Sequence, residues 1–371
     1  MKIVIFGLTV SSSWGNGHAT LWRSLCRALA RRGHRVVFFE RDVPYYAEHR
    51  DLSELEGGEL VLYDSWAGAL PAARRALAGA DAALVTSYCP DGPEASTLVL
   101  DSGARVRAFY DLDSPVTLAR LEAGEPVPYL PDGGLGGFDL VLSYAGGRAL
   151  EGLRTRLGAR RVAPLYGSVD PDEYRPARRP AGGRHALSYL GTYAEDRQPA
   201  LDRLLLEPAR RLGGETFLIG GSLYPAGFPW GPNVWYRPHV PPADHPAFYA
   251  ASRLTLNVTR EPMVRSGHCP SGRLFEAAAA GAALLTDAWD GLEQFFTPGE
   301  EIVRVATTED VLDAIALPDE TIDRIARRAR ERALDEHTGD RRAAELVALL
   351  ASVASRHAPT PAAARAAAAE T

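Results

Sequence analysis

The sequence is poor in cysteine and in long apolar stretches, and it has no excess of positive charge. Three cysteines, Cys26, Cys89 and Cys269, are scattered over 371 residues without paired spacing, which argues against structural disulfides and a zinc site. The formal net charge is −6 and no basic stripe is present, so nucleic acid is not expected as a partner. No apolar run approaches membrane-spanning length and no signal peptide precedes the first predicted strand, so we expect a cytoplasmic protein without stable membrane insertion.

What the sequence does contain is a repeated alternation of apolar strands and amphipathic helices, which predicts an α/β fold. One set occupies residues 1–170, an Arg-, Pro- and Gly-rich linker follows over 171–183, and a second set occupies 184–340. The chain is long enough for two separate cores. Strands are predicted at 2–7, 35–40, 60–63, 82–86, 106–110, 140–143, 162–165, 186–190, 216–219, 234–236, 254–258, 282–286 and 302–305, and a helix at 198–212. A Pro- and Ala-rich tail over 357–371 is predicted to be disordered.

Residues 269–287 predict a loop, a helix, a tight turn and a short buried strand in succession. Ser271 or Gly272 suits the N-cap of this helix. A helix that begins at Ser-Gly-Arg offers free backbone N–H groups, the positive end of its dipole and the Arg273 guanidinium at one point, which suits a phosphate or diphosphate. Glu276, one turn later, would reach a sugar hydroxyl of the same ligand. The alternative is an ordinary βα unit without a ligand.

A second candidate phosphate-binding segment follows the predicted strand at 186–190. Gly191 would let the backbone approach a diphosphate, Thr192 offers a hydroxyl, and Arg197 can bond phosphate oxygens in a fork. The alternative is a polar loop in which Arg197 caps an acidic neighbour, Glu195 or Asp196.

The segment Arg273 to Gly281, Arg-Leu-Phe-Glu-Ala-Ala-Ala-Ala-Gly, is followed by Ala-Leu-Leu-Thr-Asp and by 289–302. This stretch resembles the nucleotide-sugar half of GT-B glycosyltransferases and, more narrowly, the bacterial spore-maturation-protein-B-like (CgeB-like) family. The resemblance implies two Rossmann-like domains facing a cleft, an N-terminal acceptor domain and a C-terminal donor domain, with a last helix (341–356) that crosses back. It also implies metal-independent transfer of a hexose from a nucleotide-diphosphate sugar, such as a UDP-sugar, to an acceptor that it does not identify.

The resemblance also gives expectations for the rest of the donor side. Gly221 and His239 lie in segments near which the base usually stacks, and Arg260 is a further candidate cation. Retaining enzymes of this fold often carry two glutamates separated by seven residues; Glu276 matches the second, but His268 stands in place of the first. This departure weakens the expectation of a retaining enzyme. His268 would instead face the transferred sugar or the phosphates, and for Arg260 and His239 a solvated loop position is the alternative.

Three residues of the first domain are the candidate catalytic groups. His18 follows the first strand at the start of a helix, and in inverting enzymes of this fold a histidine in this region often acts as general base. Asp111 and Asp113 alternate on an extended segment, so both carboxylates could face the cleft and orient His18 or bind the acceptor. Loop capping is the alternative for the two aspartates, and a metal site is disfavoured because enzymes of this fold generally need none.

Fold alone does not decide the reaction. A nucleotide-sugar epimerase or hydrolase of the same fold is the alternative enzyme. A nucleotide-sugar-binding protein without turnover is the alternative of another class, since it would fit the missing first glutamate.

Overall fold

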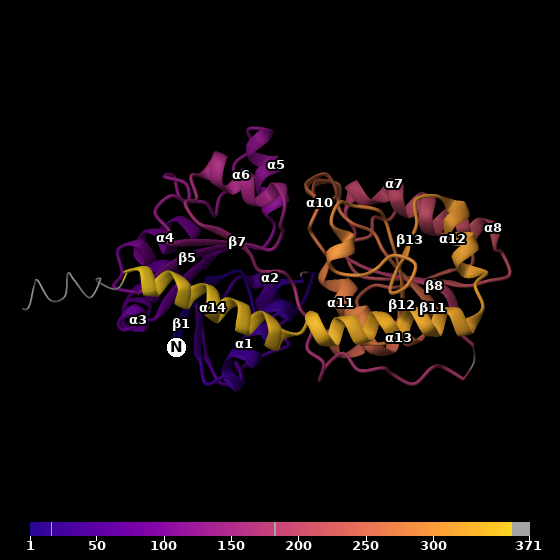
Figure 1. The fold of residues 1–371 in the computed structure, drawn as a ribbon, viewed down its shortest axis with the longest axis horizontal. Coiled ribbons are helices and arrows are strands. Elements are labelled where there is room, and N and C mark those ends of the chain that lie inside the picture. Colours follow the sequence, from indigo (N-terminus) through magenta and orange to yellow (C-terminus); the bar gives the residue numbers. More distant parts are fainter. Residues whose placement is uncertain (16, 182, 358–371) are drawn as a thin grey trace, which may run out of the picture.

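The computed structural model describes residues 1–15, 17–181 and 183–357 and places two parallel sheets side by side, each covered by helices (Figure 1). The first sheet has seven strands in the order β3-β2-β1-β4-β5-β6-β7, and the second has six in the order β10-β9-β8-β11-β12-β13. In both sheets the strand order reverses beside the first strand, which is the doubly wound arrangement of Rossmann-like domains. The predicted fold class is confirmed.

The elements of the N-terminal lobe follow the predicted alternation closely. In chain order they are β1 (Lys2–Gly7), α1 (His18–Arg31), β2 (Arg35–Arg41), α2 (Pro44–Ala47), β3 (Glu59–Tyr63), α3 (Trp66–Leu77), β4 (Ala82–Thr86), α4 (Gly92–Leu100), β5 (Val106–Asp111), α5 (Ser114–Glu122), β6 (Leu140–Ser143), α6 (Arg148–Leu157) and β7 (Val162–Pro164).

The C-terminal lobe and the last helix complete the chain. Their elements are β8 (His185–Leu190), η1 (Glu195–Arg197), α7 (Gln198–Leu201), η2 (Asp202–Leu206), α8 (Glu207–Arg211), β9 (Phe217–Gly220), β10 (Val234–Arg237), η3 (Pro242–Asp244), α9 (His245–Ala250), β11 (Ser252–Asn257), α10 (Glu261–Ser266), α11 (Gly272–Ala279), β12 (Ala283–Thr286), η4 (Leu292–Gln294), β13 (Val303–Arg304), α12 (Thr308–Ile315), α13 (Asp319–Glu336) and α14 (Gly339–His357).

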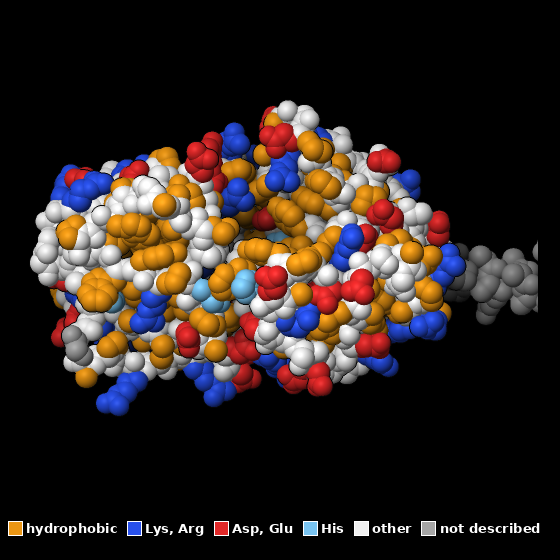
Figure 2. Space-filling view, turned by 180° about the vertical axis from the view of Figure 1, so that it is seen from behind, with side chains coloured by type: hydrophobic (Ala, Val, Ile, Leu, Met, Phe, Trp, Pro, Cys, Tyr) orange, Lys and Arg blue, Asp and Glu red, His pale blue; other side chains and the backbone are white. Residues whose placement is uncertain are grey.

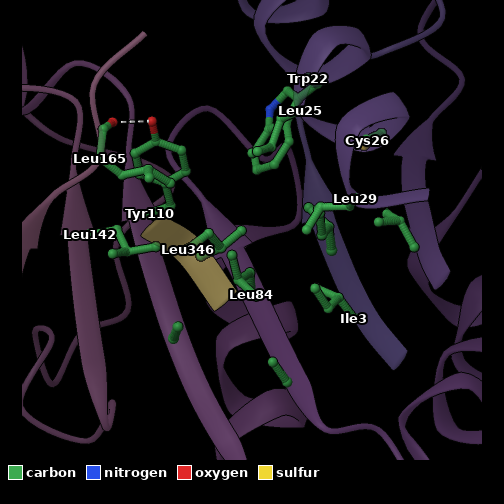
Figure 3. Close-up of a cluster of buried hydrophobic side chains, with 14 of the residues drawn as sticks. Ile3, Trp22, Leu25, Cys26, Leu29, Leu84, Tyr110, Leu142, Leu165 and Leu346 are labelled. Carbon is green, nitrogen blue, oxygen red and sulfur yellow. Dashed lines mark hydrogen bonds between the residues drawn. The ribbon is translucent and has the colours of Figure 1, made fainter. Parts of the chain in front are cut away.

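The central strands are buried on both faces, which is why they read as continuous apolar runs. In the N-terminal lobe one face packs Ile3 and Leu84 against Trp22 of α1, and Figure 3 shows Leu346 of α14 among the same side chains. The buried Tyr110 hydroxyl donates to the Leu165 carbonyl over 2.6 Å, so the polar group in this core has a partner.

The last helix belongs to the N-terminal lobe, as predicted for the cross-over helix. Figure 1 shows α14 lying along α1, while α13 lies beneath the second sheet. The chain thus crosses between the lobes twice, and the two crossings are joined: the Val169 N–H donates to the His337 carbonyl (2.9 Å) and the Gly339 N–H donates to the Val169 carbonyl (3.0 Å). Residues 358–371, most of the predicted tail, lie outside the described residues.

Two local predictions differ from the structure. The helix predicted at 198–212 is interrupted by a π-helical turn, η2; Pro208 has no N–H to donate to the carbonyl one turn earlier, so the regular ladder cannot continue there. The loop expected between β11 and α11 contains a short helix, α10, in which Pro262 occupies the first turn, where a missing N–H costs nothing. None of the helices in the described ranges is long and apolar enough to cross a membrane.

Candidate functional site

A cavity of about 540 Å³ lies between the two lobes, and side chains of both line it. Figure 2 shows the hollow between the lobes, with apolar side chains at its rim and histidines beside it. Of the predicted site residues, twelve line this cavity: His18, Asp113, Gly191, Thr192, Arg197, Gly221, His239, Arg260, Ser271, Gly272, Arg273 and Glu276. Asp111 and His268 do not.

Sheet order explains why residues far apart in the sequence meet here. β1, β4 and β5 are neighbours in the first sheet, and the segments after them carry His18, Tyr88 and Asp113. β9, β8 and β11 are neighbours in the second sheet, and the segments after them carry Gly221, Thr192 and Thr259. Because all strands are parallel, their carboxyl ends share one rim in each lobe, and the two rims face each other across the cavity.

The start of α11 forms one part of the C-terminal wall. Ser271 is extended at the N-cap and its side chain accepts no capping hydrogen bond within the described residues. The N–H groups of the first turn have no acceptor within a helix, so Gly272 and Arg273 present donors and the positive dipole end at the cavity. This arrangement suits an anion, as predicted from the Ser-Gly-Arg sequence.

Arg273 is held at the floor of the same wall. Its guanidinium donates to the Asn257 side-chain oxygen (3.0 Å) and lies 5.3 Å from the centre of the Tyr189 ring. No carboxylate of the described residues forms an ion pair with it. A Cβ at Gly191 would lie 2.8 Å from this guanidinium, so only glycine leaves room for Arg273 in this position. Its positive charge is therefore available to a ligand.

Two further arginines stand on the C-terminal wall with different partners. Arg197 donates to the Thr192 carbonyl (3.1 Å), and its buried Nε has no hydrogen-bond partner among the described residues. Arg260 donates to Asp196 (3.2 Å). The alternative in which Asp196 is capped by Arg197 is therefore not what the fold shows, because Asp196 is paired with Arg260.

Glu276 lies at the back of the cavity among buried aromatic and histidine side chains. Its carboxylate is 3.9 Å from Nδ1 of His245, and only 13% of each side chain is exposed. Nε2 of His245 is 3.1 Å from the Val240 carbonyl, which fixes the proton on Nε2 in the neutral ring. Burial lowers the pKa of His245, and Tyr174 from the linker lies 3.1 Å from Nδ1. Glu276 thus presents its carboxyl group to the cavity beside a neutral histidine.

The N-terminal wall carries one histidine and one carboxylate. His18 is the first residue of α1, and its Nε2 lies 3.9 Å from Oδ2 of Asp113. Burial lowers the pKa of His18, so the imidazole is neutral at pH 7, although Asp113 opposes the shift. The Tyr88 ring lies 5.5 Å from His18, and Tyr88 has the left-handed φ of 63°, a conformation rare outside glycine.

Asp111 and His268 occupy other places than predicted. Asp111 is the last residue of β5 and fully buried; its carboxylate accepts the Asp113 N–H (3.0 Å), so it shapes the turn beneath the cavity. Burial raises the pKa of Asp111 to about 6. Alternation failed here because the strand ends at Asp111 and the next residues turn. The His268 ring is directed at Gln294 (3.2 Å), outside the cavity lining, and the His268 carbonyl accepts the Gly146 N–H of the other lobe (2.8 Å).

Several cavity residues were not among the candidate site residues named from the sequence. Tyr88, His245 and Tyr144 line the cavity, and Asn257 holds Arg273. His239 does line the cavity, and its ring packs 4.3 Å from that of Trp14 in the other lobe. No pattern of spacing marks these residues, since each is brought in by a different strand end. No group of three or more potential metal ligands is present in the described part of the chain.

Comparison with known proteins agrees with this architecture. Residues 197–348 match the model of a family described as glycosyl transferase-like. The structure resembles sucrose-phosphate synthase from Thermosynechococcus elongatus, at 14% identity and a TM-score of 0.70, over 95% of this chain and 99% of that one. It also resembles HepE from Anabaena in complex with UDP and glucose, at 14% identity and a TM-score of 0.62, over 95% of this chain and 100% of that one. The chain has the GT-B glycosyltransferase fold.

A third structure of this fold is an α-glucosyltransferase in complex with UDP and DNA, at 12% identity and a TM-score of 0.66, over 94% of this chain and 98% of that one. A comparison with curated proteins finds no match. The predicted GT-B fold is confirmed, and the family match, which covers the C-terminal half, agrees with the predicted enzyme class of glycosyltransferase.

Proposed function

We propose that the protein transfers a sugar from a nucleotide-diphosphate sugar to an acceptor hydroxyl. The observation that carries the proposal is the distribution of charge in the cavity. All three arginines that line it, Arg197, Arg260 and Arg273, stand on the C-terminal wall, whereas the N-terminal wall offers His18 and Asp113. The C-terminal wall therefore supplies the cations for a diphosphate, and the N-terminal wall supplies a histidine beside a carboxylate that could handle a proton.

The donor diphosphate is assigned to the space between α11 and the loop after β8. Gly272 and Arg273, with their N–H groups and the Arg273 guanidinium, and Arg197 all line the cavity on this side. As the bond between the sugar and the diphosphate breaks, negative charge grows on the leaving oxygen, and fixed donors at this point lower the barrier. They would do what a metal ion does in other transferases. Glu276 would accept hydrogen bonds from hydroxyls of the donor.

The acceptor is assigned to the N-terminal wall. The acceptor oxygen would attack the anomeric carbon while neutral His18 takes its proton, and the electron pair of the broken bond leaves with the nucleoside diphosphate. Asp113, 3.9 Å from Nε2 of His18, would stabilise the imidazolium that forms. His268 is left out of this assignment because its ring lies outside the cavity lining and its main chain joins the two lobes.

Two structures of this fold are complexes with UDP, so UDP is the first ligand to test. The protein would be screened by thermal shift against UDP, GDP, dTDP, CDP and NAD, each with and without magnesium. A ligand that binds only the native state raises the melting temperature by mass action. A metal-independent shift with one diphosphate supports the donor site, whereas no shift with any diphosphate, or a shift with NAD alone, would refute it.

Turnover separates the remaining alternatives. Release of the nucleoside diphosphate only when an acceptor is present indicates a transferase. Release without acceptor indicates a hydrolase, conversion of the donor sugar indicates an epimerase, and binding without turnover indicates a sensor. The narrower CgeB-like assignment stays part of the proposal, supported by the motif at 273–302.

A further inference from the structure

Two tyrosines that do not line the cavity hold the glycine loops that do. The Tyr224 hydroxyl donates to the Gly191 carbonyl (3.2 Å), and the Tyr236 hydroxyl donates to the Gly221 carbonyl (3.0 Å). Gly191 and Gly221 follow β8 and β9, which are neighbours in the sheet, and both line the cavity.

The hydrogen bond from Tyr224 matters because it fixes the orientation of the peptide group between Gly191 and Thr192. The Gly191 N–H donates to the Gly220 carbonyl (2.8 Å) and the Tyr193 N–H donates to the Ser222 carbonyl (2.9 Å). Successive residues of an extended segment turn their N–H groups to opposite sides, so the N–H of Thr192, which lies between Gly191 and Tyr193, points away from β9. Thr192 lines the cavity, and within the described ranges its N–H has no hydrogen-bond acceptor.

The Gly191 carbonyl and the Thr192 N–H belong to the same planar trans peptide and therefore point in opposite directions. Fixing the carbonyl toward Tyr224 fixes the N–H toward the cavity. Without that hydrogen bond the freedom of glycine would let this peptide rotate. Gly221 tightens the arrangement, since a Cβ there would lie 2.1 Å from the Gly191 carbonyl oxygen and the two loops touch through their backbones.

The tyrosines are themselves fixed by an aromatic cluster, which we define as Tyr193, Tyr224, Phe228, Trp230 and Tyr236. The Tyr224 ring lies 5.0 Å from Phe228 and 5.3 Å from Tyr236, and Tyr236 lies 4.6 Å from Trp230. Trp230 and Tyr236 are 36% and 38% exposed, so the cluster keeps apolar surface in water. Support of the two loops would explain why this apolar surface is exposed.

We propose that Tyr224 and Tyr236 are positioning residues that hold the loops after β8 and β9 so that the Thr192 N–H stays directed at the donor diphosphate. This inference rests on the proposed function, because it assigns the diphosphate to this side of the cavity. The two residues act through the backbone of the loops and touch no reacting atom.

The first test needs no ligand. Tyr224→Phe and Tyr236→Phe each remove only a hydroxyl and keep the ring in the cluster. Amide hydrogen exchange of the ligand-free protein should become at least about tenfold faster over 190–194 in Tyr224→Phe, while the melting temperature stays close to that of the wild type. Trp235→Phe is the matched control: Trp235 lies on β10 next to Tyr236, its side chain is 62% exposed, and within the described residues it has no hydrogen bond to either loop.

The second test measures how the two tyrosine hydrogen bonds affect the binding of a nucleoside diphosphate. Calorimetry with UDP, or with whichever nucleoside diphosphate gives the largest thermal shift, should show a threefold to tenfold weaker Kd in Tyr224→Phe, with the Kd of the matching nucleoside unchanged. Equal losses for nucleoside and nucleoside diphosphate would indicate a general structural role and overturn the proposal. So would unchanged exchange, or faster exchange with an unchanged diphosphate Kd. A wild-type protein that binds no nucleoside diphosphate would instead overturn the proposed function, whatever the exchange shows.

Discussion

Arg273→Gln is the substitution that most directly tests how the donor wall works. Arg273 points its guanidinium into the cavity with no ion-pair partner among the described residues, and its only hydrogen bond goes to a neutral acceptor, Asn257. Its charge is therefore not neutralised by the protein. Arg260 stands on the same wall but already donates to Asp196 over 3.2 Å.

The difference between the two arginines sets the expected magnitudes. Hydrogen bonds to a charged partner contribute about 1.5–3 kcal/mol, so losing them in Arg273→Gln should weaken nucleoside diphosphate binding by about 10- to 150-fold. Gln keeps a donor for Asn257, so the loss of folding stability should come mainly from the contact with Tyr189, about 1 kcal/mol. In Arg260→Gln the lost charge was already balanced by Asp196, so we expect a change in Kd of less than about fivefold.

Both variants would be measured by calorimetry with the best nucleoside diphosphate and with its nucleoside, at about 0.15 M salt, where surface charges are screened. Only diphosphate binding should respond to Arg273→Gln. If the variant bound the diphosphate within threefold of the wild type, or if Arg260→Gln cost as much, the assignment of the diphosphate to the α11 side of the wall would be refuted.

Three further predictions concern other parts of the chain. His18→Gln should lower kcat by about 10²- to 10⁴-fold with the donor Kd unchanged. Because burial lowers the pKa of His18, the pre-steady-state rate of the wild type should stay at its plateau at pH values below 6.5. A fall in this rate already between pH 7.5 and 6.5 would contradict the assignment of His18 as the base. Gly221→Ala should weaken diphosphate binding, because the added Cβ would lie 2.1 Å from the Gly191 carbonyl oxygen. Gly221 also has a φ of 136°, at which a residue with a side chain is strained by about 1–3 kcal/mol. Calorimetry checks this prediction, with Gly213→Ala as the control because its added Cβ would meet nothing within 4 Å. Burial and Arg342 lower the pKa of His337 to about 3, so its contribution to stability is complete above the unfolded pKa near 6.5 and is lost as the pH falls. Between pH 7.5 and 5.5, urea unfolding should show a loss of unfolding free energy that is about 1.4 kcal/mol smaller in His337→Gln than in the wild type. Equal losses in the two proteins would exclude this linkage.

The donor wall could be predicted from the sequence because its main part is contiguous. Helix N-terminus, guanidinium and carboxylate fall within six residues, Ser271 to Glu276, and a helix places them at one end and on one side. A glycine followed by a polar loop after a buried strand marked Gly191 in the same local way, whereas Gly221 was expected from the family resemblance. In such cases the short-range rules for helix starts and strand ends are sufficient.

The residues that escaped prediction depend on contacts that no local rule describes. Tyr224 acts on Gly191, and Asn257 on Arg273, each through a neighbouring strand of the sheet. Tyr88 lies in the site with a left-handed φ of 63°, a conformation that the local sequence does not predict. Asp111 was misplaced for the opposite reason: a local alternation rule was extended from Asp111, the last residue of β5, to Asp113, two residues further on, where the chain already turns.

The division of labour between the walls also bears on why the lobes touch where they do. Among the described lining residues, the N-terminal wall offers His18 but no arginine or lysine for a diphosphate, whereas the three arginines stand on the C-terminal wall together with Glu276, His239 and His245. The cations and the proposed base therefore come from different lobes. Two of the contacts that join the lobes involve this region: the Gly146 N–H donates to the His268 carbonyl, and Trp14 packs on His239, which lines the cavity. Residue 268, where a retaining enzyme of this fold often has a glutamate, thus contributes its backbone to joining the walls. The proposed chemistry therefore depends on the first lobe for its base, and His18 is the residue on which it stands.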